Sequence, residues 1–168
     1  MKIKELNLKN FGKFSNQSFQ FSDGINVIYG ANEAGKTTLY HAIGALLFGL
    51  EKQRGRGSKS DTYTTYQPWG NKTWYEGDLR FETGGKVFRL ERNFYHTAKS
   101  VRLLCETDGE ELSVEQGDLE MLLGDTGAEL YFNTAAVGQL KMKPQDIIYS
   151  YLKNHIASVQ EAGENATD

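Results

Sequence analysis

The chain carries several short stretches in which apolar and polar residues alternate, the pattern of β-strands with one buried face. These stretches are residues 3–8, 19–21, 79–82, 88–92 and 101–106. Gly84-Gly85 and Asp108-Gly109 lie between or after them and are typical of tight hairpin turns. From residue 76 onward we therefore predict antiparallel hairpins, which extend one curved sheet together with the N-terminal strands.

Apolar residues three or four positions apart predict three helices. The helical stretches are residues 39–50, 119–123 and 148–159. Gly49 is a plausible stop for the first helix. A continuous apolar run, Ile25 to Tyr29, precedes that helix and predicts a buried strand. Strands and helices together indicate an α/β fold.

The segment between this run and the first helix fits the pattern G-x-x-x-x-G-K-[ST] of the phosphate-binding P-loop. It reads Gly30-Ala31-Asn32-Glu33-Ala34-Gly35-Lys36-Thr37-Thr38. Its glycines let backbone N–H groups point inward, and the following helix adds the positive end of its dipole. Lys36 would reach the β- and γ-phosphates, and the Thr37 hydroxyl would contact Mg²⁺. The flanking strand and helix favour nucleotide binding over a chance match.

Composition narrows the classes of protein that remain. With 168 residues the chain is one domain by length, and its net charge of -3 speaks against general polyanion binding, although local patches stay possible. The single cysteine, Cys105, excludes an internal disulfide and lies in an alternating apolar run, which favours a buried thiol. No apolar stretch approaches the roughly 20 residues of a membrane span, and the N-terminus lacks a signal-peptide core. We expect a soluble, cytoplasmic protein with no membrane partner.

Hydrolysis by a P-loop ATPase needs a second acidic site, an aspartate after a buried strand that holds Mg²⁺ and usually a carboxylate that orients water. The nearest candidate is Met121-Leu122-Leu123-Gly124-Asp125. Its leucines fit a helix face and no β-branched residue supports a strand, so we reject it. The chain therefore carries half of an active site.

The motifs along the chain run from a first strand followed by Asn10-Phe11-Gly12, through the P-loop, to Ala42-Ile43 and Leu47-Phe48-Gly49. This order of motifs resembles the N-terminal half of an ABC-type ATPase head. This is the group of SMC proteins, the SbcC exonuclease subunit, RecF and RecN. The Asn32-Glu33-Ala34 variant is most similar to the bacterial YhaN-like AAA-family ATPases. The resemblance implies the N-terminal lobe of a P-loop NTPase, with an antiparallel β subdomain and a C-terminal helix that leads to a coiled coil.

In that family a long antiparallel coiled coil separates the two halves of the head in sequence. The C-terminal half supplies the signature motif, the Mg²⁺-holding aspartate and the catalytic glutamate. The resemblance thus implies that this chain needs a C-terminal half, from the same or another chain, and forms a homodimer that sandwiches two ATP molecules. It also implies a role in DNA repair or chromosome maintenance, ATP hydrolysis by the full dimeric protein, and near-inactivity of this chain alone.

The resemblance also assigns site residues. The cofactor-binding positions are Lys13, Gly30, Ala31, Asn32, Glu33, Ala34, Gly35, Lys36, Thr37 and Thr38. Lys36 and Gln139 take part in catalysis, and Thr37 and Gln139 contact Mg²⁺. Lys13 sits where relatives contact the base or the phosphates. Glu33 replaces the glycine that is usual in transporters and SMC heads. The resemblance therefore does not determine how this position contacts the signature motif of the partner half.

The predicted organisation is one lobe, residues 1–168, in five parts. Residues 1–50 carry the first strands, the P-loop and a helix; 51–75 form a basic and aromatic loop; 76–115 form the hairpins; 116–145 carry a helix and the glutamine loop; 146–168 begin the coiled coil.

Two groups of side chains have roles that the sequence leaves open. Four cations lie on a predicted mobile loop, where they either bind DNA phosphates or stay solvated. They are Lys52, Arg54, Arg56 and Lys59. Trp69 or Tyr66 could stack on the adenine base, although aromatic residues at the base of a hairpin more often belong to the core.

Three arginines, Arg80, Arg89 and Arg92, are predicted to share one strand face, which is either solvated or able to bind along DNA.

Two rival functions also remain. A P-loop small-molecule kinase would continue in alternating strand–helix units, whereas this chain turns to hairpins. A non-catalytic DNA- or protein-binding scaffold would not need the intact Lys36 and Thr37.

Overall fold

The structure is a computed structural model, and it describes residues 1–53, 61–124 and 126–138. The chain divides into two compact units, residues 1–125 and 126–168. The first unit holds the sheet and the P-loop, and the second contains α4 (Ala128–Thr134). The predicted coiled-coil helix lies outside the described residues.

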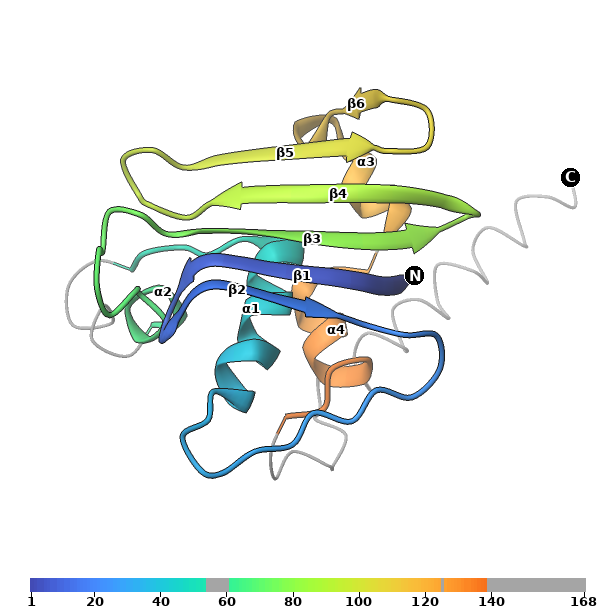
Figure 1. Cartoon of the computed structure of the whole chain (residues 1–168). Coiled ribbons are helices and arrows are strands. Elements are labelled where there is room, and N and C mark those ends of the chain that lie inside the picture. Colours follow the sequence, from blue (N-terminus) through green and yellow to red (C-terminus); the bar gives the residue numbers. More distant parts are fainter. Residues whose placement is uncertain (54–60, 125, 139–168) are drawn as a thin grey trace, which may run out of the picture. The chain divides into compact units, whose positions relative to one another are not determined.

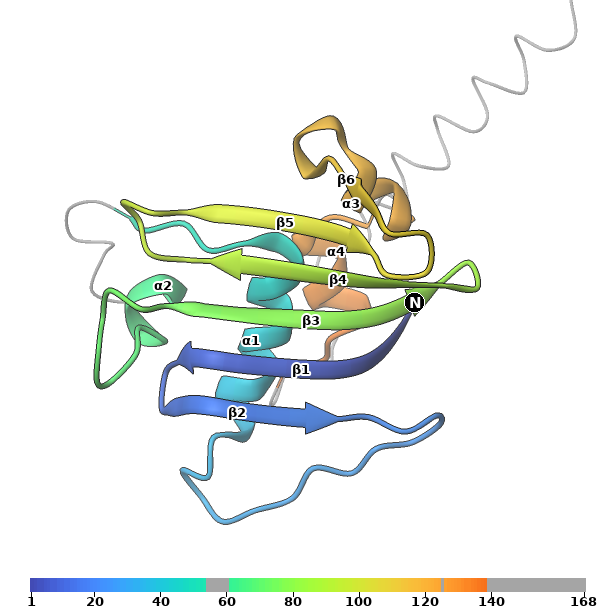
Figure 2. The same ribbon diagram turned by 45° about the horizontal axis from the view of Figure 1, so that its top comes forward.

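Within the described residues, six antiparallel strands form one sheet in the order β2-β1-β3-β4-β5-β6 (Figures 1 and 2). The strands are β1 (Lys2–Phe11), β2 (Phe14–Gln20), β3 (Glu76–Thr83), β4 (Lys86–Asn93), β5 (Ser100–Cys105) and β6 (Glu110–Leu112). The predicted hairpins and their union with the N-terminal strands are thus confirmed. Gly84 and Gly85 make the β3–β4 turn with φ angles of 58° and 76°, which glycine adopts without strain.

The helix after the P-loop, α1 (Lys36–Phe48), packs across one face of the sheet against β1, β3 and β4 (Figure 2). Gly77 of β3 lies beneath Leu46 of α1, and an added Cβ there would stand 2.9 Å from the Asn7 carbonyl oxygen of β1, so the pairing of β3 with β1 requires glycine at this position. Gly49 ends α1 as predicted, because its φ of 84° turns the chain while its N–H donates to the Ala45 carbonyl at 2.7 Å.

Among the described residues of the first unit, three short helices accompany α1. They are α2 (Thr62–Thr65), the 3₁₀ helix η2 (Val114–Gln116) and α3 (Asp118–Leu122). The helical interpretation of Leu119 and Leu122 is confirmed. Tyr63 and Tyr75 are buried in the core. The thiol of Cys105 is buried too, as the sequence predicts. No helix in the described ranges has the length and apolarity needed to cross a membrane.

The prediction of a buried strand at Ile25–Tyr29 is wrong for this structure. Residues 21–35 contain no strand, and Ile25, Val27 and Tyr29 are 93%, 79% and 91% exposed. An apolar run becomes a buried strand only when a neighbouring strand takes up its backbone hydrogen bonds. No strand of the described residues pairs with this run, so its apolar side chains face solvent.

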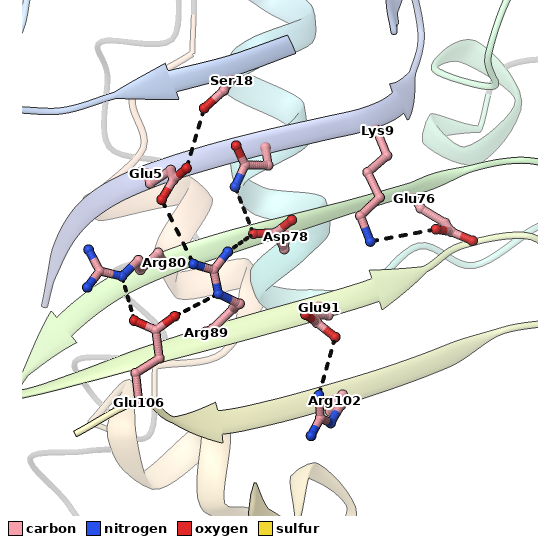
Figure 3. A network of polar contacts seen from close by, with 11 residues as sticks. Glu5, Lys9, Ser18, Glu76, Asp78, Arg80, Arg89, Glu91, Arg102 and Glu106 are labelled. Atoms are coloured by element: carbon pink, nitrogen blue, oxygen red, sulfur yellow. Dashed lines mark hydrogen bonds and ion pairs between the residues drawn. The ribbon is translucent and has the colours of Figure 1, made fainter. Parts of the chain in front are cut away.

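The face of the sheet opposite α1 carries a network of ion pairs (Figure 3). Arg89 lies at its centre, with Nη1 2.6 Å from Asp78 Oδ1 and Nε 2.7 Å from Glu106 Oε1. Glu106 also binds Arg80, and Glu5 lies 4.0 Å from Arg89. Arg80 is therefore paired with one carboxylate and Arg89 with carboxylates from several parts of the sheet.

Arg92 does not share this face, so the prediction that Arg80, Arg89 and Arg92 lie together is wrong. Residues 89 and 92 are an odd number of positions apart, and alternate residues of a strand point to opposite faces. Arg92 instead reaches the end of α1, where Nε donates to the Leu46 carbonyl at 2.6 Å and Nη2 to the Leu47 carbonyl at 3.1 Å. Its guanidinium thus caps the negative end of the helix dipole.

Candidate nucleotide-binding site

The P-loop is an exposed, irregular segment that runs into the first turn of α1. Gly35 precedes the helix with φ 105°, and Glu33 adopts φ 65°, a conformation that glycine tolerates better than glutamate. No side chain caps the start of α1, and its first turn has no acidic residue. The first amide groups of the helix therefore remain available to an external anion.

The Lys36 side chain folds back over the loop. Its Nζ donates to the carbonyl oxygens of Gly30 at 2.7 Å and Ala31 at 2.8 Å. These contacts keep the amine beside the backbone that would surround a phosphate. A short rotation of this exposed chain would exchange the carbonyl partners for phosphate oxygens.

The turn between β1 and β2 forms a second wall of the loop. Lys13 Nζ donates to the Glu33 carbonyl at 2.5 Å. The Phe14 ring lies on the backbone of Gly35, so that an added Cβ there would stand 2.5 Å from Phe14 Cζ. The expected proximity of Lys13 to the P-loop is therefore present. Phe14 was missed, because no sequence pattern indicates which loop the first residue of a strand contacts.

Asp61, at the start of α2, is buried and accepts hydrogen bonds from two backbone amides. Asp61 caps α2 by accepting from the Thr64 N–H at 2.6 Å, and its second oxygen accepts from the Gln53 N–H at 2.8 Å. Burial raises the pKa of Asp61, but the hydrogen bonds from Thr64 and Gln53 outweigh it and leave this pKa below its ordinary value. Asp61 therefore stays ionised at neutral pH and links Gln53 to α2.

An aromatic layer joins the end of α2 to the helix after the P-loop, α1. Tyr66 stacks on His41 of α1, with ring centroids 4.8 Å apart and planes at 28°. It also stacks on Phe11 of β1 at 5.9 Å. Tyr66 therefore belongs to the packing between α1, β1 and the segment after α2.

The structure thus brings Lys13 and residues 30–38 together at one site. Gln139 lies outside the described residues, as do Arg54, Arg56 and Lys59. Lys52 is described, with its Nζ 5.7 Å from the centre of the Tyr63 ring. The assignment of Gln139 and the DNA-binding role of the basic loop stay predictions.

The chain matches the AAA domain family over residues 5–161 and belongs to that family. Its class is therefore that of P-loop ATPase domains. It is 47% identical over 134 residues to the uncharacterised protein YhaN of Bacillus subtilis (strain 168), covering 78% of this chain and 12% of YhaN. It is 34% identical over 94 residues to the DNA double-strand break repair Rad50 ATPase of Pyrococcus abyssi, covering 56% of this chain and 10% of that protein.

A solved structure from work on the ATP-driven dimerisation and DNA-stimulated activation of SMC ATPases has the same fold. It matches with a TM-score of 0.54 and 21% identity, covering 91% of this chain and 92% of that one. Together these matches identify the chain as the N-terminal half of an SMC/Rad50-like ATPase head. The chain spans only about an eighth of YhaN and a tenth of that Rad50.

Proposed function

We propose that this chain binds Mg·ATP at residues 30–38 and forms half of an ATPase head that dimerises around two ATP molecules. The observation that supports it best is the uncapped start of α1 beside the Lys36 amine. Amide N–H groups and a cation aimed at one place are what a polyphosphate requires.

Each residue of the loop has a separate task in this proposal. The amides of residues 33–38 cradle the phosphates, and Lys36 leaves its carbonyl partners to neutralise the terminal phosphates. The Thr37 hydroxyl would hold Mg²⁺, which supplies charge neutralisation of the phosphate oxygens. Lys13 already reaches across the loop to the Glu33 carbonyl and would add a second cation at its rim.

The chain alone would turn ATP over very slowly, because we expect the acidic residues for hydrolysis to come from a C-terminal half. The exposed run Ile25–Tyr29 supports the need for that half, since an unpaired apolar segment of this length is costly in water. Gln139 would contact Mg²⁺ and the water near it once the head is complete. ATP would then act as a switch that closes the dimer, and hydrolysis would reopen it.

A role on DNA, in repair or chromosome maintenance, is part of the proposal and rests on the Rad50 and SMC relatives. The open sheet face offers little to DNA phosphates, because Arg80 and Arg89 are already paired with carboxylates. The basic loop at 52–59 is the better candidate. Charge reversal at Arg54 and Arg56 should weaken DNA binding and flatten its salt dependence. Unchanged binding would mean that these cations are solvated and do not contact DNA.

The consecutive hairpins do not favour the rival small-molecule kinase, which would continue in strand–helix units. The test is calorimetric titration of the chain with Mg·ATP, Mg·ADP and Mg·GTP, together with a phosphate-release assay. Lys36→Ala should abolish nucleotide binding while the fold is retained. Lys9→Ala, on the sheet face opposite α1, is the matched control and should bind like the parent. Equal affinity of the Lys36→Ala variant would refute the P-loop assignment.

A further inference from the structure

The β1–β2 turn connects the P-loop to the segment that follows α2. An added Cβ on Gly12 would stand 2.9 Å from Thr38 Cγ2, so the turn lies directly against the last residue of the P-loop. The Gly12 N–H donates to the Tyr66 carbonyl at 2.8 Å, and the Gly12 carbonyl accepts from the Trp69 N–H at 3.0 Å. Trp69 is thus tied to Thr38 through a single intervening residue.

Tyr66 and Phe14, the other aromatic residues of this wall, are already engaged. Two rings stack on Tyr66, those of His41 and Phe11. Phe14 presses on the backbone of Gly35, and Phe19 packs edge-on against it. Both rings therefore already contact other parts of the fold, and both side chains are partly buried.

Trp69 is different, because its backbone is held while its side chain is 76% exposed. An exposed indole offers a large flat face to a ligand, and burial of an aromatic ring contributes strongly to binding. Trp74, the other tryptophan of the chain, is only partly exposed. The open indole is therefore a particular property of position 69.

We propose that Trp69 stacks on the purine base of the nucleotide whose phosphates lie in the P-loop. This inference deepens the proposed function and rests on it. The base would leave the loop on the side of Thr38, pass the Gly12 turn and meet the indole face. Stacking on an indole responds to the area of the base and not to its hydrogen-bonding groups. Trp69 should therefore favour purines over pyrimidines and contribute nothing to the binding of phosphates alone.

The first test compares ligands with and without a base. Mg·ATP, Mg·UTP and Mg·tripolyphosphate are titrated calorimetrically into the parent chain, Trp69→Ala, Trp69→Phe and the control Trp74→Phe. Trp69→Ala should weaken ATP binding roughly ten-fold or more, within the range that base–aromatic stacking supplies. Its affinity for tripolyphosphate should be unchanged, and its preference for ATP over UTP should shrink. Trp69→Phe should restore most of the ATP affinity, and Trp74→Phe should match the parent.

The second test uses fluorescence. Trp74→Phe leaves Trp69 as the single indole of the chain. Its emission should be quenched on addition of Mg·ATP and should stay constant on addition of Mg·tripolyphosphate. A tryptophan that only supports the fold would not separate these two ligands.

Three outcomes would overturn the inference. Unchanged ATP affinity in Trp69→Ala would mean that the base does not meet the indole. Equal weakening of ATP and tripolyphosphate would assign Trp69 a structural role in the wall. If the parent binds ATP while Trp69 emission does not respond, the base lies elsewhere and the exposed indole serves another contact. Failure of the parent chain to bind either ligand would instead refute the proposed function itself, and the base site with it.

Discussion

Substitution of Gly35 by alanine should damage the P-loop through two separable effects. The first is conformational, because the φ of 105° at Gly35 is one that L-residues rarely adopt, at a cost of about 1–2 kcal/mol. The second is steric. The new Cβ would stand 2.5 Å from Phe14 Cζ and 3.1 Å from Lys13 Cδ, and overpacking of this kind typically costs about 1–3 kcal/mol. We expect Gly35→Ala to lower the free energy of unfolding by about 2–5 kcal/mol.

Gly117→Ala is the matched control for the conformational effect. Gly117 has φ 90° and ψ 8°, close to the 105° and 13° of Gly35, but an added Cβ there would meet no atom within 4 Å. It should therefore cost only about 1–2 kcal/mol. The difference between the two variants in urea unfolding isolates the contact with Phe14.

Removing the Phe14 ring should restore the part of the free energy of unfolding that Gly35→Ala loses to steric overlap. In a double-mutant cycle, Phe14→Ala and Gly35→Ala should couple favourably by about 1–3 kcal/mol. Mg·ATP affinity, measured in parallel, should fall in Gly35→Ala and partly recover in the double variant. If Gly35→Ala lowers the free energy of unfolding no more than Gly117→Ala does, the Phe14 ring does not contact Gly35, and the β1–β2 turn does not form a wall of the site.

Three further predictions concern the same unit. Replacing Arg92 by leucine should cost about 3 kcal/mol in urea unfolding, because two carbonyls at the end of α1 lose a charged donor; Arg92→Lys should recover part of this, and equal losses would deny the capping role. Glu33→Gly should raise the free energy of unfolding by about 0.5–1 kcal/mol, since φ 65° is unstrained for glycine; Glu33→Ala, which keeps the strain, should gain nothing. Hydrogen bonds from Arg80, and then from Arg89, hold the pKa of Glu106 below its ordinary value although burial opposes them. This stabilisation is therefore present above a pH of about 4 and lost as the pH falls through the folded-state pKa. Acid titration of thermal stability should show the loss, and Glu106→Gln should reduce its slope.

The sequence-based predictions agree best with the structure in regions that local contacts determine. The hairpins formed because period-two alternation and glycine turns agree, and α1 ended at Gly49 because the chain reverses there with a φ of 84°. The start of α1 could be located for the same reason, since the helix begins at Lys36, where the P-loop motif predicts it. The exposure of Ile25–Tyr29 could not be predicted from sequence alone, because an apolar run does not reveal whether a neighbouring strand pairs with it, and none of the described strands does.

Contacts between distant segments were the least predictable. The pairing of Phe14 with Gly35 and of Arg92 with the end of α1 depends on how the β1–β2 turn and β4 lie against the helix. A signal for Arg92 was available, since its odd spacing from Arg89 places it on the opposite face. No comparable signal pointed to Phe14.

The exposed run before the P-loop has a thermodynamic consequence. If a further strand pairs with Ile25–Tyr29, it fixes the chain immediately before Gly30, and the loop then has less conformational freedom to lose when it closes around phosphates. The two events would favour each other by the same factor, because coupling between two binding equilibria is reciprocal. Nucleotide affinity would then report whether the head is assembled, and bound nucleotide would in turn select assembled heads over separate halves.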